Sequence, residues 1–246
     1  MAIRNSRRRM MIDTSLVGAG VWLSSSASAS AATSPNEKLN IALVGAGGRG
    51  AANLAEIASE NIVALCDVDQ RRAAESYNRY PDARKYVDFR RMLDDLDQQI
   101  DAVVISAPNH IHAPASAMAM KMGKHCYCEK PLTHSVYEAR TIAGIAAEQR
   151  VATQMGTQIH ASNNYRRVVE LIQAGAIGPV HEVHIRLPDG GTADDRPQEM
   201  PPIPTELNWD LWLGPAPARP YHPCYVPHDW HYWWDFGGGP LGNIGC

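Results

Sequence analysis

Lys130, which stands between Glu129 and Pro131, is the residue of this sequence best suited to acid–base chemistry. It lies next to the end of the segment 124–131, whose apolar pattern predicts a strand. Ligands of open α/β sheets bind at the carboxyl ends of strands. In a partly dry cleft at such a strand end the ammonium form is disfavoured, so this lysine could relay a proton or polarise a substrate oxygen. Glu129 could orient the ammonium, and Pro131 would fix the backbone. The alternative is a lysine that extends from a strand end into solvent.

A glycine-rich segment, GAGGRG at 45–50, supplies a second chemical signal. It directly follows an apolar β-branched run and opens a helical pattern, which is the context of a dinucleotide-binding loop. The glycines permit a tight turn and a close approach of a pyrophosphate to the helix N-terminus. The loop residues expected to bind the cofactor are Gly45, Gly47, Gly48, Arg49 and Gly50. The alternative is a plain tight turn.

Asp67 ends the next predicted strand, 22 positions after Gly45. Its carboxylate would accept hydrogen bonds from the ribose diol of adenosine and repel a 2′-phosphate, so we expect NAD. Arg71 and Arg72 leave NADP possible, because either could reach a phosphate.

The segment SAPNHIHA at 106–113 follows a further predicted strand, and there we expect Pro108 and Asn109 to line the nicotinamide side of the site. His110 and His112 form an H-x-H pair, which we place in a loop. Because no third ligand is near in sequence, we expect no metal.

Alternating strands and helices must position these residues. Continuous apolar strands joined by amphipathic helices predict an α/β fold, a Rossmann-type doubly wound parallel sheet. The expected strands span 38–47, 61–69, 101–109, 124–131 and 151–158, and the expected helices 49–59, 70–80, 88–95, 112–123 and 135–149. The NAD(P)-binding domain therefore spans 35–157.

Residues 158–246 are expected to begin an α/β substrate domain. A helix is predicted over 163–178 and a strand over 179–188, and the segment 189–232 is rich in proline and tryptophan. Aromatic and histidine rings offer flat faces and polar tips to sugars. The residues expected to line a carbohydrate cleft are His112, Tyr165, Tyr221, His222, Trp230 and His231. The alternative is that these rings fill a domain interface.

Composition is that of an ordinary globular protein, with 45% hydrophobic and 20% charged residues and a net charge of −3 over 246 residues. No basic stripe stands out beyond the N-terminus, so nucleic acid is not an expected partner. The five cysteines are odd in number and lack metal-type spacing, which argues against a disulfide framework.

Residues 1–31 have the pattern of a signal peptide, with a basic start, a modest apolar stretch from Met10 to Leu23, and A-x-A cleavage sites ending at Ala29 or Ala31. The apolar stretch is too short to span a bilayer, so no stable membrane anchor is expected. The paired arginines favour the twin-arginine route, with its export machinery as a partner and a periplasmic or secreted location. The alternative is a disordered basic tail on a cytoplasmic protein.

The motifs GAGGRG, CDVD, APNHIHA and CEKPL, in this order, resemble the glucose–fructose oxidoreductase and inositol dehydrogenase family, called Gfo/Idh/MocA. The resemblance continues to GGGPLGNIGC near the end of the chain. It implies an NAD(P)-dependent oxidoreductase that transfers hydride between a sugar or cyclitol hydroxyl and nicotinamide. By this match Lys130 lies beside the nicotinamide and the hydroxyl that is oxidised.

One position departs from the pattern that the resemblance implies. Dehydrogenases of the family often carry an aspartate four residues before a histidine in the motif that begins at GGGPLG, and here Asn243 takes the aspartate's place as a catalytic candidate. Asparagine keeps the hydrogen bond but loses the charge, which puts a lysine–aspartate–histidine relay in doubt. Because the printed chain stops at Cys246, before that histidine, we expect it to be a fragment that binds cofactor without turnover. A homo-oligomer is expected of the full-length protein.

Two other classes of function remain open. Some relatives with twin-arginine signals are glycosidases that use NAD without net consumption, through transient oxidation at C3. A non-catalytic protein that binds the cofactor or a sugar is the third class. Net NADH formation from free sugars indicates the first class, and release of an aglycone without NADH accumulation the second. Binding without turnover indicates the third.

Export through the twin-arginine route predicts cleavage after Ala29 or Ala31. Mass spectrometry of periplasmic protein is expected to find the shortened N-terminus, and an intact Met1 would contradict the prediction. Replacing Arg7 and Arg8 together with lysine should abolish export, because the twin arginines are read by the translocase.

Overall fold

The computed structural model describes residues 38–186 and 195–245. The expected signal peptide at 1–31 and part of the expected strand at 179–188 lie outside these residues.

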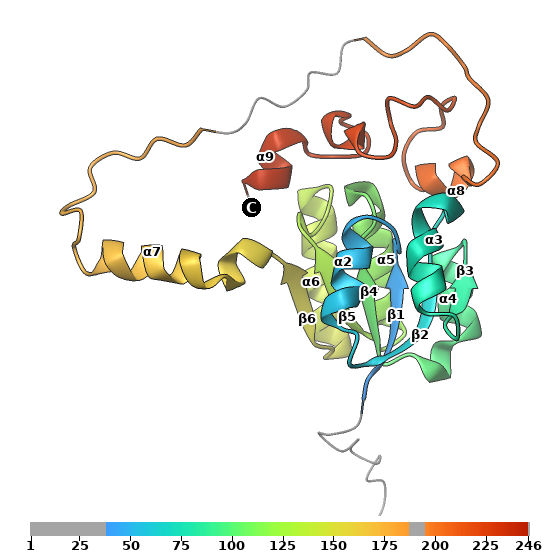
Figure 1. Ribbon diagram of the computed structural model, residues 1–246, viewed down its shortest axis with the longest axis horizontal. Coiled ribbons are helices and arrows are strands. Elements are labelled where there is room, and N and C mark those ends of the chain that lie inside the picture. The colour runs from blue at the N-terminus through green and yellow to red at the C-terminus, as the bar shows by residue number, and fades with distance from the viewer. Residues whose placement is uncertain (1–37, 187–194, 246) are drawn as a thin grey trace, which may run out of the picture. The chain divides into compact units, whose positions relative to one another are not determined.

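Six parallel strands form one sheet in the order β3-β2-β1-β4-β5-β6 (Figure 1). The crossover between β3 and β4 places the topological switch point beside β1, as in dinucleotide-binding sheets. This topology confirms the Rossmann-type fold. The strands are β1 (Asn40–Val44), β2 (Asn61–Cys66), β3 (Arg84–Tyr86), β4 (Ala102–Ile105), β5 (His125–Glu129) and β6 (Thr153–Gly156).

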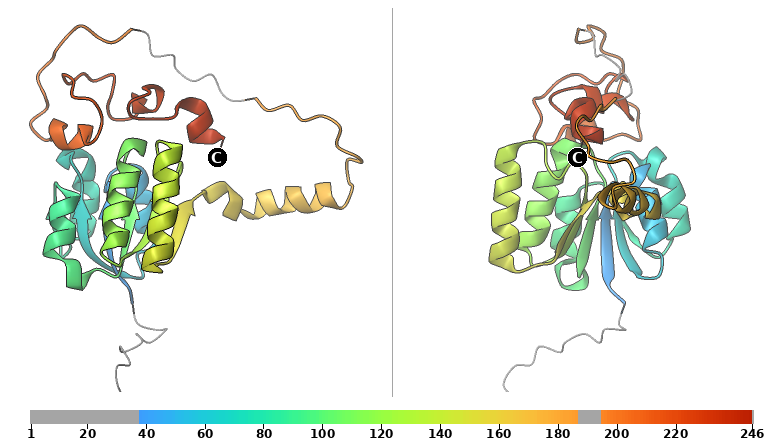
Figure 2. Two further views of the ribbon diagram at one scale, coloured as in Figure 1. Left: turned by 180° about the vertical axis from the view of Figure 1, so that it is seen from behind. Right: turned by 90° about the vertical axis from the view of Figure 1, so that its left-hand side faces the viewer.

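Helices connect the strands and cover both faces of the sheet (Figure 2). Several begin at side-chain caps: Ser135 and Glu138 form a capping box at α6, and Asp69 caps α3. The α-helices are α2 (Arg49–Glu56), α3 (Gln70–Arg79), α4 (Phe89–Asp95), α5 (Asn109–Lys121), α6 (Val136–Gln149), α7 (Asn163–Gln173), α8 (Trp209–Leu213) and α9 (Gly239–Ile244). Short 3-10 helices are η1 (Asp97–Gln99), η2 (Gln158–Ala161) and η3 (Asp229–Tyr232).

Alternate residues of the central strands supply two separate cores. On β1, Ile41 and Leu43 pack with residues of α2 and α3, whereas Ala42 and Val44 pack with residues of α4, α5 and α6. Because the sheet is covered on both faces, its inner strands are apolar at successive positions, which is the pattern the sequence showed.

Three sequence predictions of elements differ from the structure. The short edge strand β3 was not predicted, because its Arg84 and Lys85 are exposed and give no apolar run. Residues 179–186 form no strand, since no neighbouring strand among the described residues pairs with them. Helix α5 begins at Asn109, so the H-x-H pair lies in its first turn and not in a loop.

A third hydrophobic cluster lies in the proline- and tryptophan-rich part of the chain. It is built from Leu207, Leu213 and a group of aromatic rings, with Val68 of the Rossmann domain packed against it. The aromatic members are Trp209, Trp212, Tyr221, Tyr225 and Phe236. Arg219 lies over the rings of Tyr225 and Phe236 and pairs with Asp235. This cluster gives the chain after residue 200 its own apolar core, docked on the sheet domain.

His110 joins α5 to this later segment. Its ring is 2% exposed, and its Nε2 lies 2.9 Å from the carbonyl oxygen of Trp212. Its Nδ1 lies 3.4 Å from the carbonyl oxygen of Phe236. Burial lowers the pKa of His110 to about 4, although the two carbonyls oppose the change.

None of the helices in the described part of the chain is both long and apolar enough to cross a bilayer.

The depressed pKa of His110 predicts that the folded protein loses stability in acid. An unfolded histidine takes up a proton near pH 6.5, whereas the folded His110 resists protonation until about pH 4. The free energy of unfolding should therefore fall by about 2 kcal/mol between pH 7 and pH 5 from this residue alone. Urea unfolding at pH 7 and at pH 5 measures this difference. In His110→Gln the free energy of unfolding should change less between the two pH values. The exposed His181→Gln is the control, and an unchanged dependence in His110→Gln would contradict the prediction.

Candidate active site

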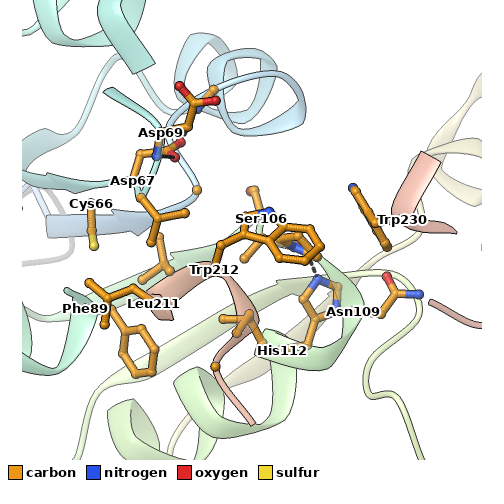
Figure 3. Close-up of a pocket in the computed structure, with 18 of the residues that line it drawn as sticks. Cys66, Asp67, Asp69, Phe89, Ser106, Asn109, His112, Leu211, Trp212 and Trp230 are labelled. Carbon is orange, nitrogen blue, oxygen red and sulfur yellow. Dashed lines mark hydrogen bonds between the residues drawn. The ribbon is translucent and has the colours of Figure 1, made fainter. Parts of the chain in front are cut away.

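A pocket of about 710 Å³ lies along the carboxyl ends of the strands (Figure 3). Its lining combines residues that follow β1, β2, β3, β4 and β5 with residues of the later segment 207–243. The volume lies within the range of small-molecule sites. The expected site residues that line it are Gly45, Gly47, Arg49, Asp67, Pro108, Asn109, His112, Glu129, Lys130, Trp230, His231 and Asn243.

The glycine loop is closed too tightly for side chains. Gly45 has φ +85°, and a Cβ there would lie 2.7 Å from the carbonyl oxygen of Ser106. A Cβ at Gly50 would lie 1.7 Å from the carbonyl oxygen of Gly45, so the first turn of α2 packs directly on the loop. Both glycines are therefore required by close backbone approach, and the loop presents its backbone to the pocket.

Asp67 is placed by the backbone amides around it. Its Oδ2 accepts a hydrogen bond from the amide of Gly47 at 2.9 Å, and its Oδ1 accepts one from the amide of Asp69 at 2.9 Å. Burial raises the pKa of the Asp67 carboxyl, and these two amides oppose the rise. The carboxyl thus stands beside the glycine loop, at the position expected for the adenosine ribose.

Of the two arginines that left NADP possible, only Arg72 lines the pocket. Its guanidinium approaches Gly48, where an added Cβ would lie 2.7 Å from Nη2. Arg71 is exposed and is not part of the pocket lining.

Lys130 and Asn243 lie together in the pocket, although 113 positions separate them in sequence. The ammonium donates a hydrogen bond of 2.6 Å to Oδ1 of Asn243 and a second one to the carbonyl oxygen of the same residue. Two of its three donors are thereby fixed by one residue of α9, and the ammonium is oriented from the later segment.

Glu129 has partners other than the ammonium that the sequence assigned to it. Its Oε1 accepts a hydrogen bond from Nε of Arg49 at 3.0 Å and another from Nδ2 of Asn53 at 2.9 Å. Its side chain is 7% exposed, so a charged partner is needed to offset its desolvation. The carboxylate therefore ties α2 to the end of β5.

Asn109 begins α5 after β4 and lines the pocket. Its Nδ2 is buried and has no hydrogen-bond partner within the described structure. An unpartnered buried donor at the rim of a pocket fits an acceptor group of a bound molecule, such as the cofactor. Together with the glycine loop, it shows that the residues present fit a dinucleotide.

His112 is held by the backbone on both sides. Its Nδ1 lies 2.7 Å from the carbonyl oxygen of Pro131, and its Nε2 lies 2.7 Å from that of Ala107 (Figure 3). Burial lowers the pKa of its ring. Each nitrogen faces a backbone carbonyl, and the neutral ring donates its single N–H to one of the two. His112 therefore lies between the ends of β4 and β5 with neither nitrogen free for a substrate.

The aromatic residues expected in a carbohydrate cleft divide into two groups. Trp230 and His231 line the pocket, with their rings stacked at 3.6 Å between centroids. Tyr221 belongs to the third cluster, His222 lies 3.7 Å from Glu199, and Tyr165 packs on His160. Those three rings do not line the pocket.

His231 has a defined protonation pattern. Burial lowers its pKa, and the charges of His228 and Lys130 lower it further. Its Nδ1 lies 2.6 Å from the carbonyl oxygen of His228, so the neutral ring carries its proton there. Its Nε2 is then a hydrogen-bond acceptor.

In the part of the chain that the structure describes, no three histidine, cysteine or acidic side chains are grouped to hold a metal ion.

Several pocket residues were not predicted from the sequence. They come from residues 87–90, where α4 begins after β3, and from the segment around α8, and at none of these positions was a site residue expected. They are Val87, Asp88, Phe89, Arg90, Leu207, Asp210, Leu211, Trp212, Gly214 and Pro215. Asn53, which does not line the pocket but donates a hydrogen bond to Glu129, was also not predicted. An asparagine inside a helix gives no indication in the sequence of a buried partner.

Comparisons with known proteins agree with this geometry. Residues 39–157 match the oxidoreductase family, NAD-binding Rossmann fold, and residues 191–246 match the C-terminal alpha/beta domain of the same Gfo/Idh/MocA family. Residues 39–157 are therefore an NAD-binding Rossmann domain. The chain belongs to the Gfo/Idh/MocA oxidoreductase family.

Curated relatives include dehydrogenases of inositol and of levoglucosan. The chain is 30% identical over 156 residues to an inositol 2-dehydrogenase of Salmonella typhimurium, which covers 60% of this chain and 45% of that protein. It is 26% identical over 155 residues to a levoglucosan dehydrogenase of Pseudarthrobacter phenanthrenivorans, covering 58% and 39%. The chain thus spans about half the length of the curated relatives it matches.

A solved structure, scyllo-inositol dehydrogenase from Lactobacillus casei with bound NAD(H) and scyllo-inositol, superposes with a TM-score of 0.51. The two are 25% identical, and the match covers 58% of this chain and 43% of that one.

The position of Asp67 predicts a preference for NAD over NADP. A 2′-phosphate beside this carboxylate would meet a like charge, so NADH should bind at least tenfold tighter than NADPH, or about 1.4 kcal/mol. Fluorescence titration of both cofactors measures the ratio. Asp67→Asn should reduce the ratio of the NADPH Kd to the NADH Kd, and the exposed Glu75→Gln should leave this ratio unchanged. If the unmodified protein bound NADPH as tightly as NADH, or more tightly, the prediction would be wrong. Arg72 would then be the residue expected to bind the 2′-phosphate.

Proposed function

We propose that the full-length protein transfers a hydride between a hydroxyl-bearing carbon of a sugar or cyclitol and NAD, with Lys130 relaying the hydroxyl proton. The observation that carries the proposal is the meeting of Lys130 and Asn243 in the same pocket as the glycine loop. The inositol and levoglucosan dehydrogenases among the relatives support the substrate class.

Alcohol oxidation needs a hydride acceptor and a group that takes the hydroxyl proton. Bound NAD would supply the hydride acceptor. Asn243 accepts two hydrogen bonds from Lys130 Nζ. As the neutral amine, Lys130 keeps these two N–H donors and turns its lone pair to the substrate hydroxyl, whose proton it takes. An amide oxygen accepts this hydrogen bond without the full charge of a carboxylate, so it orients the lysine without forming an ion pair with it.

The remaining lining suits a polyhydroxylated substrate. Nε2 of His231 can accept a hydrogen bond from a hydroxyl, and the Trp230 ring provides a flat apolar face in the same pocket. Both residues support a sugar or cyclitol over a purely apolar alcohol.

We also propose that the protein is exported through the twin-arginine route. The paired arginines after Ser6 and the A-x-A sites support this location.

Removing the proton relay should reduce turnover far more than cofactor binding. In the full-length protein, Lys130→Ala is expected to lower kcat by about 10²-fold or more. The Kd of NADH should stay within about threefold, because the glycine loop and Asp67 contribute most of its binding. Lys130→Arg should restore little activity, since a guanidinium does not release its proton. Steady-state kinetics and cofactor titration measure the two effects.

The exposed Lys85→Ala serves as the control, because it removes a lysine outside the pocket. Near-normal turnover in Lys130→Ala would show that Lys130 is only a residue at a strand end, and the proposed role would be wrong.

A further inference from the structure

The segment 206–215 runs against the residues that follow β2, more than 130 positions earlier in the chain. The amide of Gln70 donates to the carbonyl oxygen of Glu206 at 3.0 Å, and the amide of Asn208 donates to that of Val68 at 2.8 Å. Asp69 and Leu207 form an antiparallel bridge between these two hydrogen bonds. Backbone pairing thus fixes the segment beside Asp67.

Apolar packing in the third cluster also holds the segment in place. Trp209, Trp212 and Leu213 are each 6–7% exposed within the third cluster, which also contacts Val68. At the far end of the segment, a Cβ on Gly214 would lie 2.6 Å from Cδ1 of Ile111. The segment is therefore anchored to the sheet domain at both ends, and is not a free loop.

The same segment lines the pocket. Leu207, Asp210, Leu211 and Trp212 line it, together with residues 87–90 that follow β3. Figure 3 draws Leu211, Trp212 and Phe89 among the lining side chains. Leucine and phenylalanine side chains provide an apolar surface suited to a flat heterocycle.

Charged groups from both sides meet at the same end of the pocket. Arg90 donates to Oδ1 of Asp88 through Nε at 2.9 Å and to Oδ2 through Nη2 at 2.7 Å. The pKa of Arg90 is raised, mainly by Asp88 and further by the charge of Asp210. Asp88 thus orients the guanidinium, and the carboxylate of Asp210 on α8 lies close enough to act on its charge.

The strand order tells which part of a dinucleotide this end receives. The pyrophosphate belongs at the glycine loop after β1, and the nicotinamide lies toward β4 and β5, where Asn109 and Lys130 are found. The adenosine half must then extend over β2 and β3, past Asp67. That is the end at which residues 206–208 pair with residues 68–70.

We infer that the segment 206–215 forms the outer wall of the adenosine subsite, with Leu211 and Phe89 contacting adenine. The inference rests on the proposed use of NAD, but it concerns the half of the cofactor remote from the reacting carbon. The wall makes adenosine binding depend on the later part of the chain.

Binding of ADP-ribose, which lacks the nicotinamide, tests the wall without any turnover. In the full-length protein, Leu211→Ala should raise the Kd of ADP-ribose in calorimetric titration about tenfold, because contact area with the adenine is lost. The matched control is Leu171→Ala, which removes an exposed leucine of α7 outside the pocket. Its Kd should equal that of the unmodified protein.

Hydrogen–deuterium exchange provides a second measurement on the unmodified protein. Saturating ADP-ribose should slow amide exchange in 206–215 at least fivefold and leave α7 unchanged. Equal Kd values for Leu211→Ala and Leu171→Ala, unchanged exchange in 206–215, or no binding of ADP-ribose to the unmodified protein would each overturn the inference.

The two proposals fail separately. If no sugar or cyclitol is oxidised while Leu211→Ala still weakens ADP-ribose binding, the proposed function fails and the wall stands. If sugar oxidation depends on Lys130 while Leu211→Ala binds ADP-ribose normally, the wall fails and the function stands.

Discussion

The buried carboxylate of Glu129 is the constraint on which the arrangement of the site depends. It ends β5 in a nearly solvent-free position, where an unpaired charge would cost several kcal/mol. Arg49 and Asn53 offset this cost, and both belong to the helix that the glycine loop opens. The same hydrogen bonds therefore fix the distance between the loop that would hold the pyrophosphate and Lys130, the next residue after Glu129.

Two histidines extend this constraint to the rest of the pocket. His112 lies between the carbonyls of Ala107 and Pro131, which follow β4 and β5, and its neutral ring donates a hydrogen bond to one of them. His110 links α5 to the carbonyls of Trp212 and Phe236 in the later segment. Both rings are buried, and each lies between backbone segments that are distant in sequence. Rigid backbone around the reacting centre favours a reproducible substrate position.

Much of the fold could be predicted from the sequence, because strands buried on both faces leave continuous apolar runs and their helices leave a 3.6-residue period. The exposed edge strand at Arg84 left neither signal. The glycine loop and Asp67 could be found because they lie in one local unit. The partner of Glu129 could not be predicted from the sequence. The spacing of the residues does not show whether Arg49 or Lys130 pairs with the Glu129 carboxylate. The contribution of Leu211 was equally hidden, since it depends on backbone pairing between segments far apart in the chain.

The distance in sequence between Val68 and Asn208 has a consequence for the order in which the site is made. A ribosome completes all six strands, which end at Gly156, before it synthesises the segment that pairs with Val68. A chain that folded its sheet at this stage would have the side beside Asp67 and Phe89 uncovered. It would offer a dinucleotide an open groove, whereas the finished protein offers a pocket.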